Sequence, residues 1–363
     1  MLPLNRPFRL LMTVDSVGGI WRYALDLCAE FAQRGVSVTL TGFGPPPSAG
    51  QRREADAAGV DLVWLDAPLD WTGESNGGLQ RGAAALDSLL RERSPDLLHL
   101  NTPPLAALLE QRPPCVAAAH SCLATWWRAM RAAPLPPECQ SHADDMAAGL
   151  AAADVVTAPT AAFAAQLRAC YGPLPALRVV TNGGRAIAPG PKQPLVLSAG
   201  RWWDEAKNLE ALEAAAPGIV WPVYVAGALN GPGSAAPAPA NVRSLGSLDH
   251  RDLAAWFSKA PVFVSAARYE PFGLAVLEAA NAGAALVLSD IPTFRELWGE
   301  CALFVDPERP EEIAQGVNLL VRDADLRERL ARRAQERAAA FTVARQADAL
   351  ADAYAAAAAL QTV

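Results

Sequence analysis

Long apolar runs are missing from this chain, and no stretch approaches the roughly 20 consecutive apolar residues that a membrane-spanning helix requires. Basic residues are also in deficit, because 31 Lys and Arg face 38 Asp and Glu and leave a net charge of −7. This balance argues against a nucleic-acid-binding protein and gives no general attraction to anionic lipid. Peripheral membrane contact through a local patch stays open but is not indicated.

Clustered metal ligands and paired cysteines are absent as well. The six cysteines form no C-x-x-C pair and do not group with histidine, so we expect buried free thiols in a reducing cytoplasm. No Asp-x-Asp element lies in a loop suited to a divalent cation. The N-terminal residues 1–11 lack an apolar stretch followed by a small-residue cleavage site, and are interpreted as leading into a first strand rather than as a signal peptide. The sequence therefore predicts a cytoplasmic protein with no metal site.

What is present is a repeated alternation of strand-like and helical patterns. With 363 residues, 52% hydrophobic and 19% charged, the chain has room for two folded domains. The expected strands lie at 9–15, 36–42, 62–65, 97–100, 116–119, 155–158 and 179–181, then at 195–199, 223–227, 242–245, 262–266, 286–289 and 303–305. Helical patterns lie at 20–35, 78–93, 138–153, 160–171, 209–215 and 251–259, in the segment that contains Glu270 and Glu278, and from 311 onward. The alternation predicts an α/β protein with two doubly wound, Rossmann-like domains facing across a cleft.

Turn-forming residues mark the boundary between the two halves. Asn182-Gly183-Gly184 and the proline-rich stretch 188–194 are typical of a linker. We place the N-terminal domain at 1–187 and the C-terminal domain at 188–345, with a last helix at 346–363 that crosses back to the N-terminal domain. The segment 228–240, rich in Gly, Pro and Ala, is interpreted as a mobile loop.

The most informative stretch reads YEPFGLAVLEAA. Glu270 and Glu278 are eight positions apart, which along a helix axis corresponds to roughly 12 Å. Between them, the N–H groups around Phe272, Gly273 and Leu274 mark a helix start, which favours anions. This layout suits a ligand with hydroxyl groups at two ends and negative charge in the middle, such as a sugar joined through a diphosphate to a nucleoside. An ordinary amphipathic helix with two solvated glutamates is the alternative.

Two basic side chains follow the first strand of the second half. Two cations in a loop at this position, Arg201 and Lys207, could hold a diphosphate and offset charge as the bond between sugar and phosphate breaks. A surface ion-pair cluster with Asp204 and Glu205 is the alternative.

The first half offers weaker signals. Gly18 and Gly19 would let the backbone approach phosphates, although any tight turn between a strand and a helix favours glycine. His120 follows a strand of the parallel sheet, where such folds display reactive groups. A core histidine satisfied by backbone is the alternative.

With these residues laid out, the chain resembles a retaining glycosyltransferase of the GT-B fold, of the glycosyltransferase family 4 type. The resemblance is strong over 195–341 and looser in the first half, where Gly18-Gly19, His120 and Asn182-Gly183 carry it. The motifs of the second half are Ser198-Ala199-Gly200-Arg201, Lys207-Asn208-Leu209, Leu245-Gly246-Ser247-Leu248, the 270–278 segment, Ser289-Asp290, Phe294-Arg295-Glu296 and Leu303-Phe304-Val305-Asp306-Pro307.

The resemblance implies an acceptor-binding first domain and a second domain that binds the donor, a nucleotide sugar. It implies that Glu270 binds the donor sugar and Glu278 the ribose, and that His120 lies near the anomeric carbon. Transfer would retain the anomeric configuration, with the leaving phosphate taking the proton of the acceptor and with no metal or other cofactor. The implied catalytic residues are Arg201, Lys207, Glu270 and His120, and the implied donor-binding residues are Gly18, Gly19, Phe272, Gly273, Leu274 and Glu278.

The expected reaction is transfer of a hexosyl group from a nucleoside-diphosphate sugar to an unknown hydroxyl acceptor. A nucleotide-sugar epimerase and a non-catalytic nucleotide-sugar binder stay open as alternatives on the same fold. The residues do not reveal the base, the sugar, the acceptor or the oligomeric state.

Overall fold

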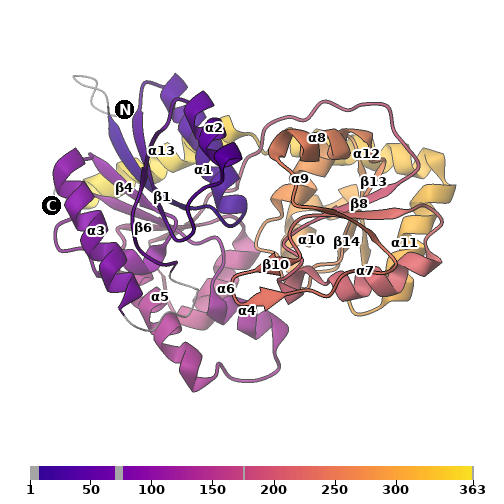
Figure 1. The fold of residues 1–363 in the computed structure, drawn as a ribbon, viewed down its shortest axis with the longest axis horizontal. Coiled ribbons are helices and arrows are strands. Elements are labelled where there is room, and N and C mark those ends of the chain that lie inside the picture. Colours follow the sequence, from indigo (N-terminus) through magenta and orange to yellow (C-terminus); the bar gives the residue numbers. More distant parts are fainter. Residues whose placement is uncertain (1–7, 70–76, 175, 362–363) are drawn as a thin grey trace. The chain divides into compact units, whose positions relative to one another are not determined.

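The computed structural model describes residues 8–69, 77–174 and 176–361, which form two compact α/β units (Figure 1). Unit 1 comprises Met1–Gly183 and Val343–Val363, and unit 2 comprises Gly184–Thr342. The chain divides a few residues before the positions expected from sequence, and the hydrogen bonds explain why. The Gly183 N–H donates to Gln346 of the last helix at 2.8 Å, whereas the Gly184 N–H donates to the Phe341 carbonyl at 3.1 Å.

Unit 1 is built on a seven-stranded sheet in the order β3-β2-β1-β4-β5-β6-β7, with every pairing parallel. The order reverses between β1 and β4, as in a doubly wound fold. The last strand lies two residues before its expected position. The strands are β1 (Arg9–Asp15), β2 (Ser37–Phe43), β3 (Asp61–Trp64), β4 (Leu97–Leu100), β5 (Cys115–Ala118), β6 (Val155–Ala158) and β7 (Leu177–Val179).

In unit 1, helices α1, α2, α6 and α13 contact strands of this sheet, whereas α4 contacts α5 and α6. Two of them, α2 and α4, were not predicted, and α2 shows why: Ala55 is its one buried residue, so it carries no apolar periodicity. Its start is fixed instead by a capping box between Ser48 and Gln51. The helices are α1 (Gly19–Gln33), α2 (Ala49–Ala57), α3 (Gly78–Arg93), α4 (Leu123–Met130), α5 (Gln140–Ala152), α6 (Ala161–Tyr171) and α13 (Val343–Leu360), with short 3₁₀ turns η1 (Pro103–Ala107) and η2 (Pro137–Cys139).

The last helix, α13, belongs to unit 1 although it follows unit 2 in sequence. It packs beside α1 over β5 and β6. Leu350 and Tyr354 lie in the same core cluster as Phe31 of α1 and Met12 of β1. The first unit is therefore assembled from two distant pieces of chain.

Unit 2 has a six-stranded sheet in the order β12-β9-β8-β13-β14-β15, again with every pairing parallel. The order reverses between β8 and β13. Residues 230–235, expected as part of a mobile loop, instead form a short antiparallel hairpin of β10 (Asn230–Gly231) and β11 (Ser234–Ala235). The remaining strands are β8 (Val196–Ala199), β9 (Val223–Ala226), β12 (Arg243–Gly246), β13 (Val262–Ser265), β14 (Ala285–Ser289) and β15 (Ala302–Val305).

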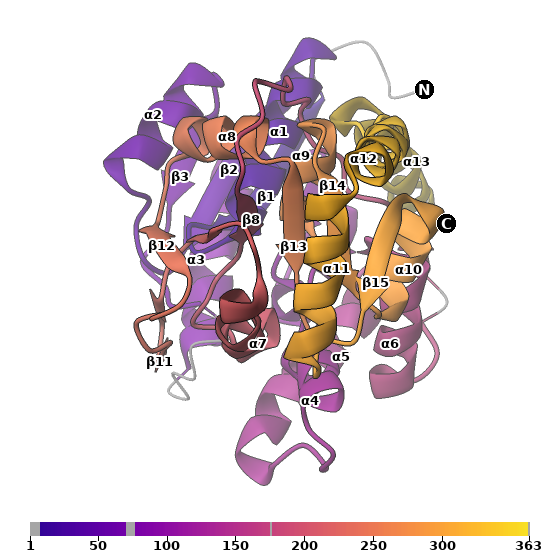
Figure 2. The ribbon, with the colours of Figure 1, turned by 90° about the vertical axis from the view of Figure 1, so that its right-hand side faces the viewer.

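Alternate residues of the central strands divide between two cores. Val262 and Val264 of β13 lie in one cluster and Phe263 in the other, because successive strand side chains point to opposite faces. Both faces are covered, α7 and α11 contributing to one and α8 and α9 to the other (Figure 2). The helices are α7 (Leu209–Ala215), α8 (His250–Lys259), α9 (Leu274–Asn281), α10 (Pro292–Trp298), α11 (Pro310–Arg322) and α12 (Ala324–Ala338), with 3₁₀ turns η3 (Glu205–Lys207), η4 (Ala216–Gly218) and η5 (Gly299–Cys301).

All six cysteines lie in the described part of the chain and are unpaired. Cys28, Cys115 and Cys122 are buried, as expected. The expectation of burial is wrong for the other three, which are partly exposed. Across residues 8–69, 77–174 and 176–361, no helix is both long and apolar enough to cross a membrane.

Candidate active site

In unit 2 the candidate residues gather where the strand order reverses. Arg201 and Lys207 follow β8, and Glu270 follows the neighbouring strand β13. Loops at the carboxyl ends of adjacent parallel strands meet at one edge of the sheet, and a reversal of strand order is where such sheets bind ligands.

Lys207 and Glu270 form an ion pair across these two loops. The Lys207 Nζ lies 2.7 Å from the Glu270 Oε2, and the two side chains are 15% and 20% exposed. The Lys207 stem packs over Gly200, where a Cβ would lie 3.5 Å from the Lys207 Cγ. The lysine is thus held across the site by a carboxylate from the next strand.

Arg201 lies nearer to solvent and is held by its own loop. Its side chain is 40% exposed, and its Nη2 is 3.7 Å from the Asp204 Oδ2. Its guanidinium lies 5.4 Å from the centre of the Trp203 ring, which in turn packs against Gly231 of the hairpin. For Arg201, the ion pair with Asp204 foreseen in the alternative interpretation does form.

Asn208 fixes the loop that carries Lys207. It adopts a left-handed conformation with φ 60°, which asparagine tolerates better than most residues. Its Nδ2 donates to the Ala266 carbonyl at 3.0 Å and to the Pro307 carbonyl at 2.9 Å. These bonds tie the loop after β8 to the loops after β13 and β15.

The segment from Glu270 to Leu274 leads into helix α9. The Glu270 carbonyl accepts a hydrogen bond from the Thr293 hydroxyl at 2.6 Å. Gly273 has φ 93°, in the left-handed region, and caps the helix that begins at Leu274. The Phe272 side chain is buried beside Phe341. Only the backbone of Phe272 is therefore left to contact a ligand at the start of the helix. The first amides of α9 follow at once, and such groups lack intrahelical partners.

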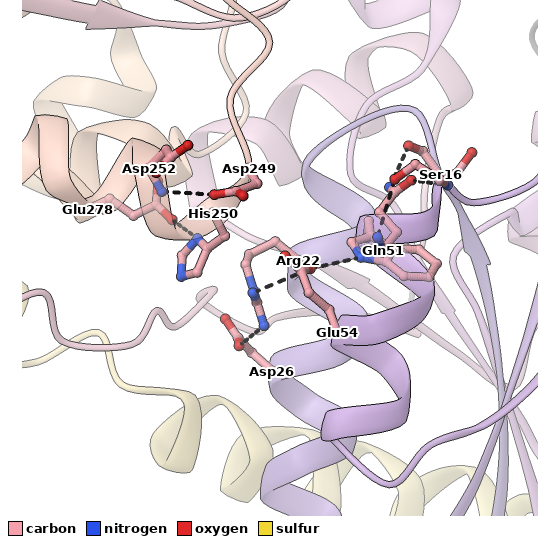
Figure 3. Close-up of polar contacts among 11 residues, drawn as sticks. Ser16, Arg22, Asp26, Gln51, Glu54, Asp249, His250, Asp252 and Glu278 are labelled. Carbon is pink, nitrogen blue, oxygen red and sulfur yellow. Dashed lines mark hydrogen bonds and ion pairs between the residues drawn. The ribbon is translucent and has the colours of Figure 1, made fainter.

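Glu278 lies one turn into α9 with a side chain 15% exposed, and its Oε1 is 4.0 Å from the Nδ1 of His250 (Figure 3). His250 is the first residue of α8, after the capping residue Asp249, whose side chain accepts from the Asp252 N–H at 2.9 Å. Neither Glu278 nor Glu270 is a freely solvated helix glutamate, so that alternative is wrong. His250 was missed because its neighbour comes from another helix.

In unit 1, Gly18 and Gly19 lie at the start of α1, Gly18 as its capping residue and Gly19 as its first. The turn before them is closed by Asp15, whose Oδ1 accepts from the Val17 N–H at 2.8 Å. In the first turn of the helix, Arg22 donates to Asp26 at 2.7 Å (Figure 3).

His120 lies two residues beyond β5 and is partly exposed. Its Nε2 lies 2.7 Å from the Oδ1 of Asn101, so its hydrogen-bond partner is a side chain rather than the backbone of the alternative interpretation. Burial, with a smaller contribution from His99, lowers the pKa of the His120 imidazole to about 3. The ring is therefore neutral at physiological pH.

The structure thus brings together Arg201, Lys207, Glu270, Phe272, Gly273, Leu274 and Glu278 within two loops and one helix of unit 2, and places Gly18, Gly19 and His120 in unit 1. Sequence reasoning missed Asn101, Trp203 and His250, and it named Asn208 only within a motif, without a role. The positive signal for Asn208 was its place directly after Lys207, before an apolar helix.

Two doubly wound parallel sheets, one of them with a cation–carboxylate pair beside a glycine-capped helix, define a class of two-domain α/β proteins. Residues 17–183 match the family model Glycosyltransferase Family 4, and residues 185–337 match the model Glycosyl transferases group 1. The chain belongs to the GT-B glycosyltransferases of the family 4 type.

The solved structures agree on the fold. Sucrose-phosphate synthase from Thermosynechococcus elongatus superposes with a TM-score of 0.80 at 20% identity, covering 96% of this chain and 98% of that one. Anabaena HepE in complex with UDP and glucose superposes with a TM-score of 0.75 at 18% identity, covering 98% and 100%.

Curated relatives match over shorter stretches. The D-rhamnosyltransferase WbpZ of Pseudomonas aeruginosa is 32% identical over 160 residues, 41% of this chain and 41% of that protein. The O-antigen chain mannosyltransferase B of Escherichia coli is 27% identical over 137 residues, 38% of this chain and 30% of that protein. The matched region therefore spans less than half of each relative.

Proposed function

We propose that this protein is a retaining glycosyltransferase that moves a hexosyl group from a nucleoside-diphosphate sugar to an acceptor hydroxyl. The observation that carries the proposal is the Lys207–Glu270 pair, 2.7 Å apart where the strand order reverses, beside the start of α9. A cation, a carboxylate and a helix N-terminus together offer partners for both phosphate and hydroxyl groups. Complexes of Anabaena HepE with UDP and with UDP-glucose support a donor of this class.

The donor would lie along the segment from Glu270 to Glu278. The amides at Phe272, Gly273 and Leu274 would contact the diphosphate. Ionised carboxylates only accept hydrogen bonds and suit vicinal hydroxyls, so Glu270 would bind the sugar and Glu278 the ribose. His250, 4.0 Å from Glu278, would hold that carboxylate in position.

In the reaction, the bond between the anomeric carbon and the diphosphate oxygen breaks as the acceptor oxygen bonds to the same face of that carbon. The acceptor proton passes to the departing phosphate. Arg201 and Lys207 supply positive charge where negative charge develops on the diphosphate, which lowers the barrier. In this proposal two side chains provide the charge, and the reaction needs no metal or other cofactor. The roles of Gly18, Gly19 and His120 stay predictions.

A thermal-shift screen with UDP, GDP and ADP, each bare and joined to hexoses, tests donor binding. A ligand that binds the native state at 100 times its Kd stabilises it by about 2.7 kcal/mol. We expect one series to stabilise the wild type, and Glu278→Gln to reduce that shift for the bare diphosphate as well as for the sugar nucleotide. Failure of every nucleotide to raise the melting temperature would contradict the proposal.

Release of nucleoside diphosphate separates transfer from the two alternatives. A transferase releases the diphosphate in step with glycosylation of an added acceptor. An epimerase converts the sugar with no acceptor and no release, and a non-catalytic binder does neither. The screen should therefore be followed by assaying diphosphate with and without a panel of hydroxyl acceptors.

A further inference from the structure

Asn101 is held rigidly at the carboxyl end of β4 in unit 1. It is 7% exposed. Its backbone N–H donates to the Thr13 hydroxyl at 2.7 Å, and its side-chain Nδ2 donates to the Thr13 carbonyl at 2.6 Å. Because a carbonyl can only accept, the amide nitrogen must face Thr13 and the amide oxygen must face the other way.

Two histidine side chains lie within hydrogen-bond distance of that amide oxygen. The Nε2 of His120 lies 2.7 Å and the Nε2 of His99 lies 3.2 Å from the Asn101 Oδ1. An amide oxygen carries no hydrogen, so each ring must donate from Nε2. Asn101 therefore selects the same tautomer in both histidines.

The far side of His99 agrees with this assignment. Its Nδ1 lies 2.8 Å from the hydroxyl of Tyr354, which is buried on α13. A neutral ring with hydrogen on Nε2 has a bare Nδ1, which accepts from the tyrosine. Burial lowers the pKa of His99 to about 4. At neutral pH the ring is therefore uncharged and carries a hydrogen on one nitrogen only.

His120 contacts the same groups on one side. The ring of Tyr23 meets it edge-on with centroids 4.5 Å apart, and the Tyr23 hydroxyl lies 3.4 Å from the His99 Nε2. The titratable groups that face it from neighbouring elements are thus His99 on β4 and Tyr23 on α1, with Tyr354 one step further. All three are neutral at pH 7, because burial raises the pKa of the tyrosines and lowers that of His99.

We propose that Asn101 is a positioning residue that fixes the hydrogen of His120 on Nε2, so that Nδ1 is the bare nitrogen of the neutral ring. The available nitrogen of His120 is then a hydrogen-bond acceptor, which suits a ligand hydroxyl and neither donates a proton nor neutralises a phosphate. The identity of that hydroxyl, on a sugar or its acceptor, rests on the proposed function. The tautomer itself does not.

Nitrogen-15 NMR of the histidine rings in the full chain tests this directly, because the sequence has four histidines. His120→Gln and His99→Gln assign two of the four signals. In the wild type we expect both rings to carry hydrogen on Nε2 and to stay neutral from pH 8 to pH 5. In Asn101→Leu, which keeps the branched shape of the side chain and removes the acceptor, the His120 Nε2 hydrogen should exchange with water about fivefold faster, since one hydrogen bond is worth about 1 kcal/mol.

Tyr354→Phe is the matched control. It removes a partner of His99 and none of His120, so the His99 signals should change while the His120 tautomer is retained. A wild-type His120 with hydrogen on Nδ1, or charged at pH 6, would overturn the proposal whether or not the variants fold. Unchanged exchange in Asn101→Leu would also overturn it. Because these spectra are taken on the free protein, their outcome is independent of donor binding.

Discussion

Adding one methyl group at Gly273 should damage the proposed donor site through the backbone. Gly273 has φ 93°, a conformation that costs a residue with a Cβ about 1–2 kcal/mol. The new Cβ would also lie 3.0 Å from Phe294 Cε1, 3.2 Å from Val276 Cγ2 and 3.4 Å from Glu270 Cγ. The first two distances are tight, and the Phe294 ring is fully buried, so the loop must shift.

The expected size of the effect follows from these contacts. The backbone penalty and roughly 1 kcal/mol for the crowding, less about 0.4–1 kcal/mol for the stiffer unfolded chain, leave Gly273→Ala destabilised by about 1–2.5 kcal/mol. For a domain of this size that lowers the melting temperature by about 2–10 °C. Movement of the loop also displaces Glu270, so nucleotide-sugar binding should weaken at least tenfold.

Gly283 provides a control at the other end of α9. Its φ is 73°, and a Cβ there would meet Pro189 at 3.5 Å, an ordinary contact. Gly283→Ala should therefore lose about 1 kcal/mol of stability and keep its ligand. Urea unfolding gives the stabilities, and the ligand-induced thermal shift gives the binding. If both variants lost binding equally, or Gly273→Ala bound as well as the wild type, the assigned role of this loop would be wrong.

Four further predictions concern the site of unit 2 and two histidines of unit 1. Lys207→Met should lower turnover about 10²–10³-fold, as loss of one preorganised charge does elsewhere, while circular dichroism shows a retained fold; undiminished turnover counts against the mechanism. Glu270→Gln should weaken the nucleotide sugar more than the bare diphosphate in calorimetry, and an equal loss would place this carboxylate away from the sugar. Gly231→Ala would set a Cβ 2.2 Å from the Trp203 indole, which packs against Arg201. Affinity for the bare diphosphate should therefore fall several-fold, and the additional affinity given by the sugar should stay unchanged. His99 and His120, whose pKa values burial lowers to about 4 and about 3, accept protons more readily when unfolded. The free energy of unfolding should therefore be highest above pH 6.5 and should fall by up to about 1.4 kcal/mol per pH unit for each ring down to pH 4. Urea titrations of His120→Gln should show a shallower fall.

Much of the fold could be predicted because buried parallel strands are recognisable in a sequence as short apolar runs. β4 and β6 lie at the predicted residues. Helix α2 escaped because it buries one alanine, and the hairpin at 230–235 escaped because its order depends on contact with Trp203 rather than on its own composition.

The candidate site divides in the same way. Lys207, Glu270 and Gly273 could be proposed from local pattern, since each depends on its place beside a strand or helix end. Asn101 and His250 could not, because their partners are remote in sequence: Asn101 is 88 residues from Thr13, and His250 meets Glu278 from a different helix. No periodicity reports such tertiary neighbours.

Unit 1 is formed by two segments of the chain that are separated by unit 2, and this has a consequence for its biosynthesis. The helix that places Tyr354 against His99 and Phe31 emerges only after the roughly 160 residues of unit 2. At about 5–20 residues per second, the ribosome takes on the order of ten to thirty seconds to make that insertion. During this interval the nascent first unit has an open flank over Met12 and Phe31 and lacks the tyrosine that completes its histidine network, so unit 1 acquires its finished architecture only after unit 2 has been synthesised.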